Sequence, residues 1–463
     1  MQLNAPLTSD PSPKGRENTG AKKIFLKEHS RDYSLPLGGR DRDGAFRRAM
    51  MLLLSLFTFH FSQAQSISLE SCYASAAEHY PTAVQTTLYQ QIAEQQQKNL
   101  GAAFNPQLQL NGTASYQSPV VTVPIKIPGV EIPEQNHDQY KVTLDAGQLI
   151  YDGGVTKQSQ TILQTNSQLQ QQQVQVDLYK VRDLVLQSYF SVLLLDQQKQ
   201  ILLAQKNTFS KKLEQVNAGI QYGTVLKSQA DILNAQLLTL EQSLAENSSN
   251  REAAIQMLNL LTGNNYNSST ILTEPEEKII SDNTIARPEL NLFSLQKKNL
   301  SLQTGLSHDK RMPKLSAYGQ AGYGRPGYNL FDNTFQPFFA VGVKLNWNIL
   351  GWNVANREGQ VNDLNSQIVQ SNQSAFELKT KLEATQQQND IEKFKKLLEL
   401  DKQLVDLRKS VASTVETQFQ EGTATATDFV TEQNNSAQAE LNQKIHQLQL
   451  LQAEMKLKNI LGI

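Results

Sequence analysis

A stretch of 64 residues, 155–218, contains neither Gly nor Pro, the two residues that most often end a helix. Apolar residues recur along it, and just beyond it, at alternating steps of four and three: Val174, Leu178, Val181, Val185, Val192, Leu195, Leu202, Phe209, Leu213, Val216 and Ile220. Ser188, Lys199 and Lys206 interrupt this seven-residue repeat, and we interpret both lysines as solvated exceptions. The pattern predicts one continuous helix that packs along a narrow seam.

The predicted helix is too long and too polar to lie in a membrane. At about 1.5 Å per residue it would reach roughly 95 Å, whereas the hydrocarbon core of a bilayer is roughly 30 Å thick. No stretch after Phe61 approaches the ~18 consecutive apolar residues that identify a transmembrane helix. If the rest of the chain enters a membrane, we expect it to do so as β-strands.

Residues 1–64 have the features of a leader and signal peptide, which is removed or disordered. Two arginines at 47–48 precede the short apolar run 51–61, and small residues before Gln65 predict cleavage between Ala64 and Gln65. The residues before this run show no apolar periodicity, which suggests an over-extended reading frame or a disordered leader. An N-terminal anchor helix is the alternative.

Composition excludes several classes of function. Residues 1–64 hold ten Lys and Arg and six Asp and Glu, so the remainder has 33 basic and 38 acidic residues and a net charge of −5. That balance gives no basic surface for nucleic acid. Cys72 is the only cysteine, so no intrachain disulfide is possible. We expect it to be a small buried packing residue, with lipid attachment as the alternative.

Two segments, 107–151 and 314–350, alternate apolar and polar residues with the period of two that predicts β-strands. Each segment contains two such runs around a Pro-containing loop, and therefore predicts a β-hairpin. In the first hairpin the apolar positions are Leu108, Leu110, Gly112, Ala114 and Tyr116, then Tyr140, Val142, Leu144, Ala146 and Ile150. In the second they are Leu315, Ala317, Gly319, Ala321 and Tyr323, then Phe339, Val341, Val343, Leu345, Trp347 and Ile349.

The order of predicted elements occurs twice, which indicates an internal duplication. The expected boundaries are a first repeat at 65–262 with a helix, the hairpin 107–151 and long helices at 155–262, a linker at 263–285, and a second repeat at 286–463 with a helix, the hairpin 314–350 and long helices at 353–461. Gly223-Thr224 and Gly422-Thr423 break the long helices 199 residues apart. The predicted fold class is therefore mainly α with two β-hairpins.

Strands of this length with one apolar face are typical of membrane β-barrels. Four strands cannot close a barrel, and open edges in hydrocarbon are costly. Two copies would supply eight strands, whose interior side chains fill, and three would supply twelve, which leave room for a channel. A small soluble sheet packed on a helix is the alternative.

Several short motifs in this order resemble the TolC-like outer-membrane efflux proteins over nearly the whole mature chain. They are Leu69 to Ala77 with Pro81, Asn105-Pro106, Gln148 to Gly154, the Gly223/Asp231 and Gly422/Asp428 helix breaks, and Arg287-Pro288-Glu289. The resemblance implies a homotrimer with a twelve-stranded β-barrel in the outer-membrane lipid and an α-helical barrel of coiled-coil helices in the periplasm. It also implies docking to a periplasmic adaptor, a membrane fusion protein, and to an inner-membrane transporter.

The resemblance makes the two helix breaks the candidate site. It implies that Gly223, Thr224, Gly422 and Thr423 form helix-tip turns that dock the adaptor, and that Asp428 and Asp231 constrict the periplasmic end of the pore. Thr431 and Ala424 occupy positions where the family often has a second acidic and a basic residue, so only a single ring of Asp428 is expected. The alternative is that both acids simply complement a helix N-terminus.

The sequence contains no catalytic or metal-binding motif, so we expect a protein that is not an enzyme and needs no cofactor. The predicted function is the outer-membrane exit duct of a tripartite efflux or type I secretion system, which passively exports substrates received from the adaptor and transporter. A periplasmic adaptor or a coiled-coil spacer of a transport assembly is the alternative. The sequence does not identify the cargo.

Overall fold

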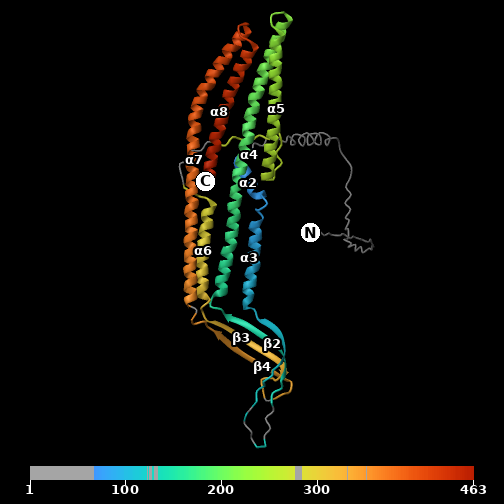
Figure 1. Cartoon of the computed structure of the whole chain (residues 1–463), viewed down its shortest axis with the longest axis vertical. Coiled ribbons are helices and arrows are strands. Elements are labelled where there is room, and N and C mark those ends of the chain that lie inside the picture. The colour runs from blue at the N-terminus through green and yellow to red at the C-terminus, as the bar shows by residue number, and fades with distance from the viewer. Residues whose placement is uncertain are drawn as a thin grey trace, which may run out of the picture. The chain divides into compact units, whose positions relative to one another are not determined.

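The computed structural model describes residues 67–122, 124, 128–129, 134–276, 284–330, 332–350 and 352–463. The predicted leader, with its cleavage site between Ala64 and Gln65, lies outside the described residues. Residues 64–463 form one compact, mostly helical unit (Figure 1). Its elements are α2 (Leu69–His79), α3 (Gln85–Gly101), η1 (Ala102–Phe104), β1 (Gln107–Tyr116), β2 (Asp138–Tyr151), α4 (Val155–Gln221), α5 (Lys227–Thr262), α6 (Pro288–Asp309), β3 (Lys314–Arg325), β4 (Gln336–Asn346), α7 (Trp352–Gln420) and α8 (Ala426–Leu461).

The long helix predicted over 155–218 is confirmed as α4, a single helix of 67 residues. Asp152 stabilises the start of this helix, because its carboxylate accepts hydrogen bonds from the Gly154 and Thr156 N–H groups at 2.9 and 2.6 Å. Gly154 itself lies at φ +92°, a conformation that favours Gly. No described helix is long and apolar enough to cross a membrane.

The seam predicted along α4 is buried, but the core in the middle of the helix is wider than a seam. Val185 and Val192 of the repeat are fully buried, and so are Leu186 and Tyr189, which lie outside it. The reason is that α2, α5 and α8 all pack on α4. Such packing from several sides buries more than one helix face. Tyr189 also donates its hydroxyl to carbonyl oxygens at 2.7 and 2.6 Å, which satisfies a buried polar group.

Three further residues, Lys199, Lys206 and Cys72, lie in the environments that the sequence predicted for them. Lys199 is exposed, and Lys206 forms an ion pair with Glu241 at 2.9 Å. Cys72 is fully buried in the core cluster with Val185 and Leu258, as the packing interpretation predicted. Burial raises the pKa of its thiol to about 11.

The four strands form one antiparallel sheet in the order β1-β2-β3-β4. One row of residues crosses all four strands, with Leu110 opposite Leu144, Leu144 opposite Ala321, and Ala321 opposite Phe339. This register places every predicted apolar run on the same face. In the part of the chain that the structure describes, the sheet packs on η1 rather than under an α-helix. This arrangement does not support the alternative of a sheet covered by an α-helix.

One strand boundary differs from the prediction. The alternation predicted a strand that continues to Ile349, but β4 ends at Asn346. Asn346 pairs with Lys314, the first residue of β3. The preceding residue, Pro313, has no N–H to extend the ladder. Trp347 and Ile349 are consequently exposed beyond the sheet.

Candidate functional site at the two helix turns

The first turn connects α4 to α5 at the end of the helices remote from the strands (Figure 1). Gly223 lies at φ +72°. The backbone N–H and the hydroxyl of Thr224 both donate to the Gly219 carbonyl oxygen, each at 3.0 Å. Leu226 occupies the N-cap position of α5 and offers no side-chain cap. The turn therefore depends on Gly and Thr for its geometry and leaves the start of α5 uncapped.

The second turn, between α7 and α8, repeats that geometry. Gly422 lies at φ +74°, and the N–H and hydroxyl of Thr423 donate to the Gln418 carbonyl oxygen at 2.9 and 3.0 Å. A Cβ added at Gly422 or Gly223 would meet no heavy atom within 4 Å. Both glycines are therefore required by backbone conformation and not by lack of space.

Asp428 is part of a capping box at the start of α8. Its carboxylate accepts hydrogen bonds from the Thr425 N–H at 3.0 Å and the Thr425 hydroxyl at 2.7 Å, and its own N–H donates to that hydroxyl at 3.2 Å. These bonds hold the pKa of the exposed Asp428 carboxyl below its usual value. The carboxylate is therefore ionised and fixed in place.

The two predicted acidic residues are not equivalent in position. Asp231 is the fifth residue of α5 and is exposed. With an offset of 199 residues, Asp428 corresponds to Gln229, and the cap Thr425 corresponds to Leu226. The first turn thus has neither member of the capping box. Leu226 and Tyr222 are instead 71% and 84% exposed, which makes this tip apolar.

A buried cluster behind the turns joins the two helix pairs. Phe209 of α4 packs edge-on against Phe429 of α8, and Phe419 of α7 stacks on the same ring, with centroid distances of 5.8 and 5.4 Å. Lys212 of α4 is 4% exposed, lies 5.2 Å from the centre of the Phe429 ring, and approaches Glu416 of α7 at 3.2 Å. Sequence reasoning did not identify this lysine, because its contacts come from helices that are remote in the chain.

At both turns the described side chains cap helices or pack together, and none is placed to react with a substrate. Within the described ranges, no group of three or more His, Cys, Asp or Glu side chains is arranged to hold a metal ion. The arrangement is that of a structural tip whose two acidic residues lie on its surface and whose phenylalanines are buried behind it around Lys212.

Comparison with known proteins identifies the family. Residues 72–264 match the family described as "Outer membrane efflux protein". This segment belongs to the outer membrane efflux protein family. Proteins of this family and the structural neighbours are outer-membrane proteins with a periplasmic helical part. No curated protein sequence matches the chain.

Solved structures of outer-membrane proteins share the fold of this chain. VceC from Vibrio cholerae is 13% identical with a TM-score of 0.59, and the match covers 85% of this chain and 96% of VceC. The Campylobacter jejuni channel CmeC is 14% identical with a TM-score of 0.59, and the match covers 85% of each chain. The Neisseria gonorrhoeae channel MtrE is 16% identical at 0.58, covering 85% of this chain and 88% of MtrE. The family and these neighbours are outer-membrane proteins or channels, and not enzymes.

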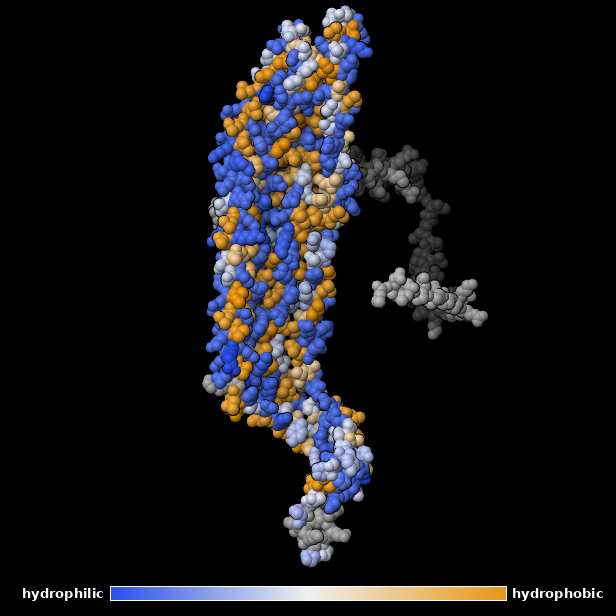
Figure 2. All heavy atoms as spheres, in the orientation of Figure 1, coloured by the Kyte–Doolittle hydropathy of each residue, from blue (hydrophilic) through white to orange (hydrophobic). Residues whose placement is uncertain are grey.

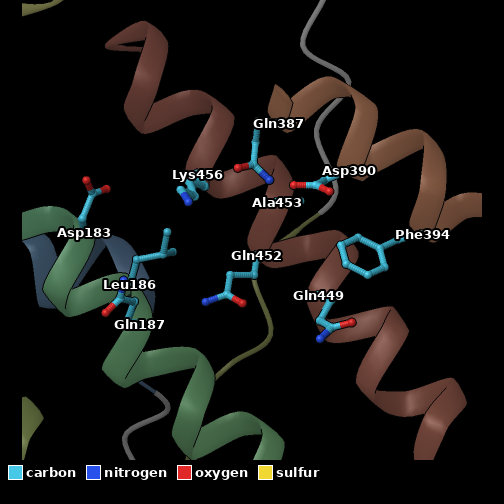
Figure 3. Close-up of a pocket in the computed structure, with 10 residues that line it drawn as sticks. All are labelled: Asp183, Leu186, Gln187, Gln387, Asp390, Phe394, Gln449, Gln452, Ala453 and Lys456. Atoms are coloured by element: carbon cyan, nitrogen blue, oxygen red, sulfur yellow. The ribbon is translucent and has the colours of Figure 1, made fainter. Parts of the chain in front are cut away.

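A polar groove lies farther along the helices, where α4, α7 and α8 meet. It encloses about 360 Å³. Figure 3 shows Asp183 of α4, Asp390 of α7 and Lys456 of α8 around it, together with Gln387, Gln449 and Gln452. Charges of both signs and amides suit water and polar solutes, and they select no one chemical class of ligand.

The Arg287-Pro288-Glu289 motif has a structural role that its sequence did not reveal. The Arg287 guanidinium pairs with Glu289 at 2.5 Å and lies 4.7 Å from the centre of the Tyr179 ring. It also donates to the Asn459 carbonyl oxygen at 3.3 Å. The motif therefore ties the start of α6 to α4 and to the end of α8. No local pattern identifies Tyr179 and Asn459 as its partners.

Proposed function

We propose that the chain is the exit duct of a tripartite efflux or type I secretion assembly. In this proposal, substrates enter at the helical end and leave passively through a β-barrel. A periplasmic adaptor and an inner-membrane transporter deliver the substrates and supply the energy. The observation that carries the proposal is the sheet, which exposes a whole apolar face and has two unpaired edges.

The apolar face of the sheet suits lipid. Leu110, Phe339 and Val341 are 73%, 76% and 77% exposed, although each lies in the middle of a strand. In water an apolar sheet face of this size would favour aggregation. In an outer membrane the same face is the lipid-facing side of a barrel, with polar residues directed to the interior.

The sheet edges support assembly from several copies. Within the described residues, β1 and β4 each pair on one side only, and unpaired edges in hydrocarbon cost several kcal/mol for each backbone group. β1 and β4 are antiparallel, so β4 of one copy can pair with β1 of the next and close a ring. We propose three copies, which give a homotrimer with twelve strands.

The helices support the same ring. α7 lies on one side of the helical part, and α3 and α5 lie on the other side (Figure 1). All three helices carry exposed apolar residues. The α7 residues are Val361, Leu364, Ile368, Leu378, Leu382, Leu400, Leu404, Leu407 and Val411, and those on α3 and α5 are Leu88, Ile92, Leu238, Met257 and Leu260. Figure 2 shows hydrophobic residues along the edge where α7 runs. Two different apolar surfaces favour a head-to-tail ring, here an α-helical barrel.

The matching turn geometry at Gly223 and Gly422 supports the proposed two-fold repeat, with repeats at 65–262 and 286–463. We further propose that Gly223, Thr224, Gly422 and Thr423 dock the adaptor and that Asp428, with Asp231, narrows the pore at the tips. Three Asp428 carboxylates around one axis would repel one another and attract cations. Opening would separate the α7–α8 pair from the α4–α5 pair.

Membrane fractionation and planar-bilayer recording test the duct. The full chain is expected in the outer-membrane fraction, extractable only with detergent, and the purified protein is expected to form ion-conducting channels. An unheated gel sample should migrate as an oligomer that boiling dissociates. A monomer that stays in buffer without detergent would instead support the adaptor or coiled-coil spacer.

A further inference from the structure

The polar face of the sheet contains a small pocket that the proposed duct does not require. It encloses about 310 Å³ and is lined by Gln107, Gln109, Asp145, Tyr318, Gln320 and Tyr328 together with nearby backbone. These side chains come from β1, β2, β3 and the loop after β3. The pocket therefore depends on the register of three strands.

The carboxylate of Asp145 is held in place by neutral donors only. Asn111 of β1, Thr143 of β2 and Gln320 of β3 donate to it at 2.6, 3.0 and 2.5 Å. Among the described residues, no Lys or Arg forms an ion pair with Asp145. Lys141 on the same strand directs its ammonium over the rings of Phe338 and Tyr328, 4.7 and 5.6 Å from their centres. The carboxylate of Asp145 is thus positioned by hydrogen bonds and has no direct ion-pair partner among the described residues, and a bound cation would share the Tyr328 ring with Lys141.

Two tyrosines border this carboxylate. Tyr318 lies across Gly342 of the next strand, where an added Cβ would come within 2.7 Å of the tyrosine hydroxyl. Tyr328 belongs to the loop after β3, and its hydroxyl donates to the Gln320 side-chain oxygen at 2.9 Å. The amide nitrogen of Gln320 in turn donates to Asp145. The loop is therefore tethered to the carboxylate through one glutamine.

Phe338 and two glycines fix the position of this loop. The Tyr328 ring meets the Phe338 ring edge-on, with 4.8 Å between centroids. Phe338 lies so close to Gly322 that a Cβ there would be 2.4 Å from its ring, and a Cβ on Gly327 would touch Gln336 and Phe338 at 3.6 and 3.8 Å. The loop thus lies against the polar face of the sheet and places an aromatic ring beside Asp145.

We propose that this pocket binds organic cations of the quaternary ammonium class as they pass through the duct. A positioned carboxylate supplies the charge, and aromatic rings supply the surface that weakly hydrated cations favour. The inference rests on the proposed function, since the polar face must line the conduit. In a homotrimer three such pockets would surround one lumen and favour cationic cargo at the membrane end of the duct.

Block of the reconstituted full-length protein by tetraethylammonium tests the pocket. Single-channel current is recorded in planar bilayers while tetraethylammonium chloride is added to both sides. For Asp145→Asn we expect the half-blocking concentration to rise about fivefold, and for Tyr328→Ala about threefold, because a charge pair and a cation–π contact are each worth about 0.5–1 kcal/mol at accessible sites.

Two variants serve as matched controls. Asp332→Asn removes one negative charge from the loop after β3, which also carries Tyr328. Asp332 lies outside the pocket and accepts a hydrogen bond from the Thr334 N–H at 2.9 Å. Tyr328→Phe keeps the ring and removes only the bond to Gln320. Both should retain block within about twofold of the wild type.

The outcomes separate this inference from the proposed function. Channels that conduct normally but show equal block in the wild type, Asp145→Asn and Tyr328→Ala would overturn the pocket and leave the duct intact. A wild-type protein that forms no channels would overturn the duct, and the pocket with it. Because Tyr328→Ala leaves the strands unchanged, it remains informative if Asp145→Asn fails to assemble.

Discussion

At the level of single residues, Asp428 combines two roles that mutation can separate. It caps α8 through Thr425, and in the proposed trimer it also narrows the pore. Thr425→Val removes the cap but keeps the charge, and should destabilise the first turn of α8 by a free energy of about 1 kcal/mol. Asp428→Asn removes the charge, and should raise single-channel conductance or change its dependence on cation type. Equal conductance in Asp428→Asn and the wild type would exclude Asp428 from the constriction.

The pH dependence of this cap follows from the lowered pKa of Asp428. A carboxyl whose pKa is lower in the folded state contributes stability that is fully present above its unfolded pKa. That contribution is lost as the pH falls through the folded-state pKa of Asp428, which lies below the usual value of an aspartate. The protection of amides at the α8 turn, measured relative to the intrinsic exchange rate at each pH, should therefore be high at neutral pH and fall only under strongly acidic conditions. In Asp428→Asn this acid-dependent step should disappear.

At the level of helices, the buried Lys212 is the clearest link between the α4–α5 and α7–α8 pairs. Glu416→Gln would leave its ammonium buried beside Phe419 and Phe429 without a full negative partner. Because Glu416 is 37% exposed, we expect a cost of about 1–2 kcal/mol and not the larger cost of a fully buried pair. Hydrogen exchange in peptides from both turns should accelerate accordingly.

Two control variants help to interpret the hydrogen-exchange result for Glu416→Gln. Lys212→Met fills the same space without charge, and should leave exchange unchanged or slower, since apolar replacement of a buried pair is often stabilising. Glu440→Gln breaks the ion pair with Lys409, whose side chains are 56% and 36% exposed for Lys409 and Glu440, and should have little effect. If Glu416→Gln behaved like Glu440→Gln, Lys212 would not hold the two pairs together.

At the level of strands, two adjacent residues of β4 test which face meets lipid. Val341→Lys places a charge on the apolar face, and Ala340→Lys places one on the polar face, as their register with β3 requires. A lysine facing lipid near the midplane costs about 2–4 kcal/mol. Val341→Lys should therefore reduce the heat-sensitive oligomer in the outer-membrane fraction, whereas Ala340→Lys should not. Equal losses in both variants would contradict a lipid-facing surface.

The elements themselves could be predicted because their signals are local. The Gly- and Pro-free run that became α4, and the alternation that became β1 to β4, each depend on neighbouring residues only. The partners of Lys212, Arg287 and Asp145 could not be predicted, because each comes from an element remote in the chain. The capping box of Thr425 and Asp428 follows a local T-x-x-D pattern, but no local pattern weighs that role against a position in a pore.

At the level of the whole molecule, the polar face of the sheet distinguishes between ring sizes. It holds Tyr318, Phe338 and Tyr328 together with the loop after β3. Eight strands leave an interior that side chains of this size would fill, whereas twelve leave an open path. A duct therefore needs three chains, and β1 and β4 must alternate around the ring.

Chemical crosslinking and light scattering of the detergent-extracted protein measure the number of chains in the ring directly. The crosslinked ladder should end at three bands, and the protein mass should equal three processed chains, each below the 51.8 kDa of the full sequence. A ladder that ended at two would mean eight strands and an interior closed by its own side chains, which is incompatible with export. The same samples carrying Val341→Lys should show fewer trimers and more monomers, because a charge on the apolar face opposes insertion into lipid, where β4 pairs with the β1 of the next chain.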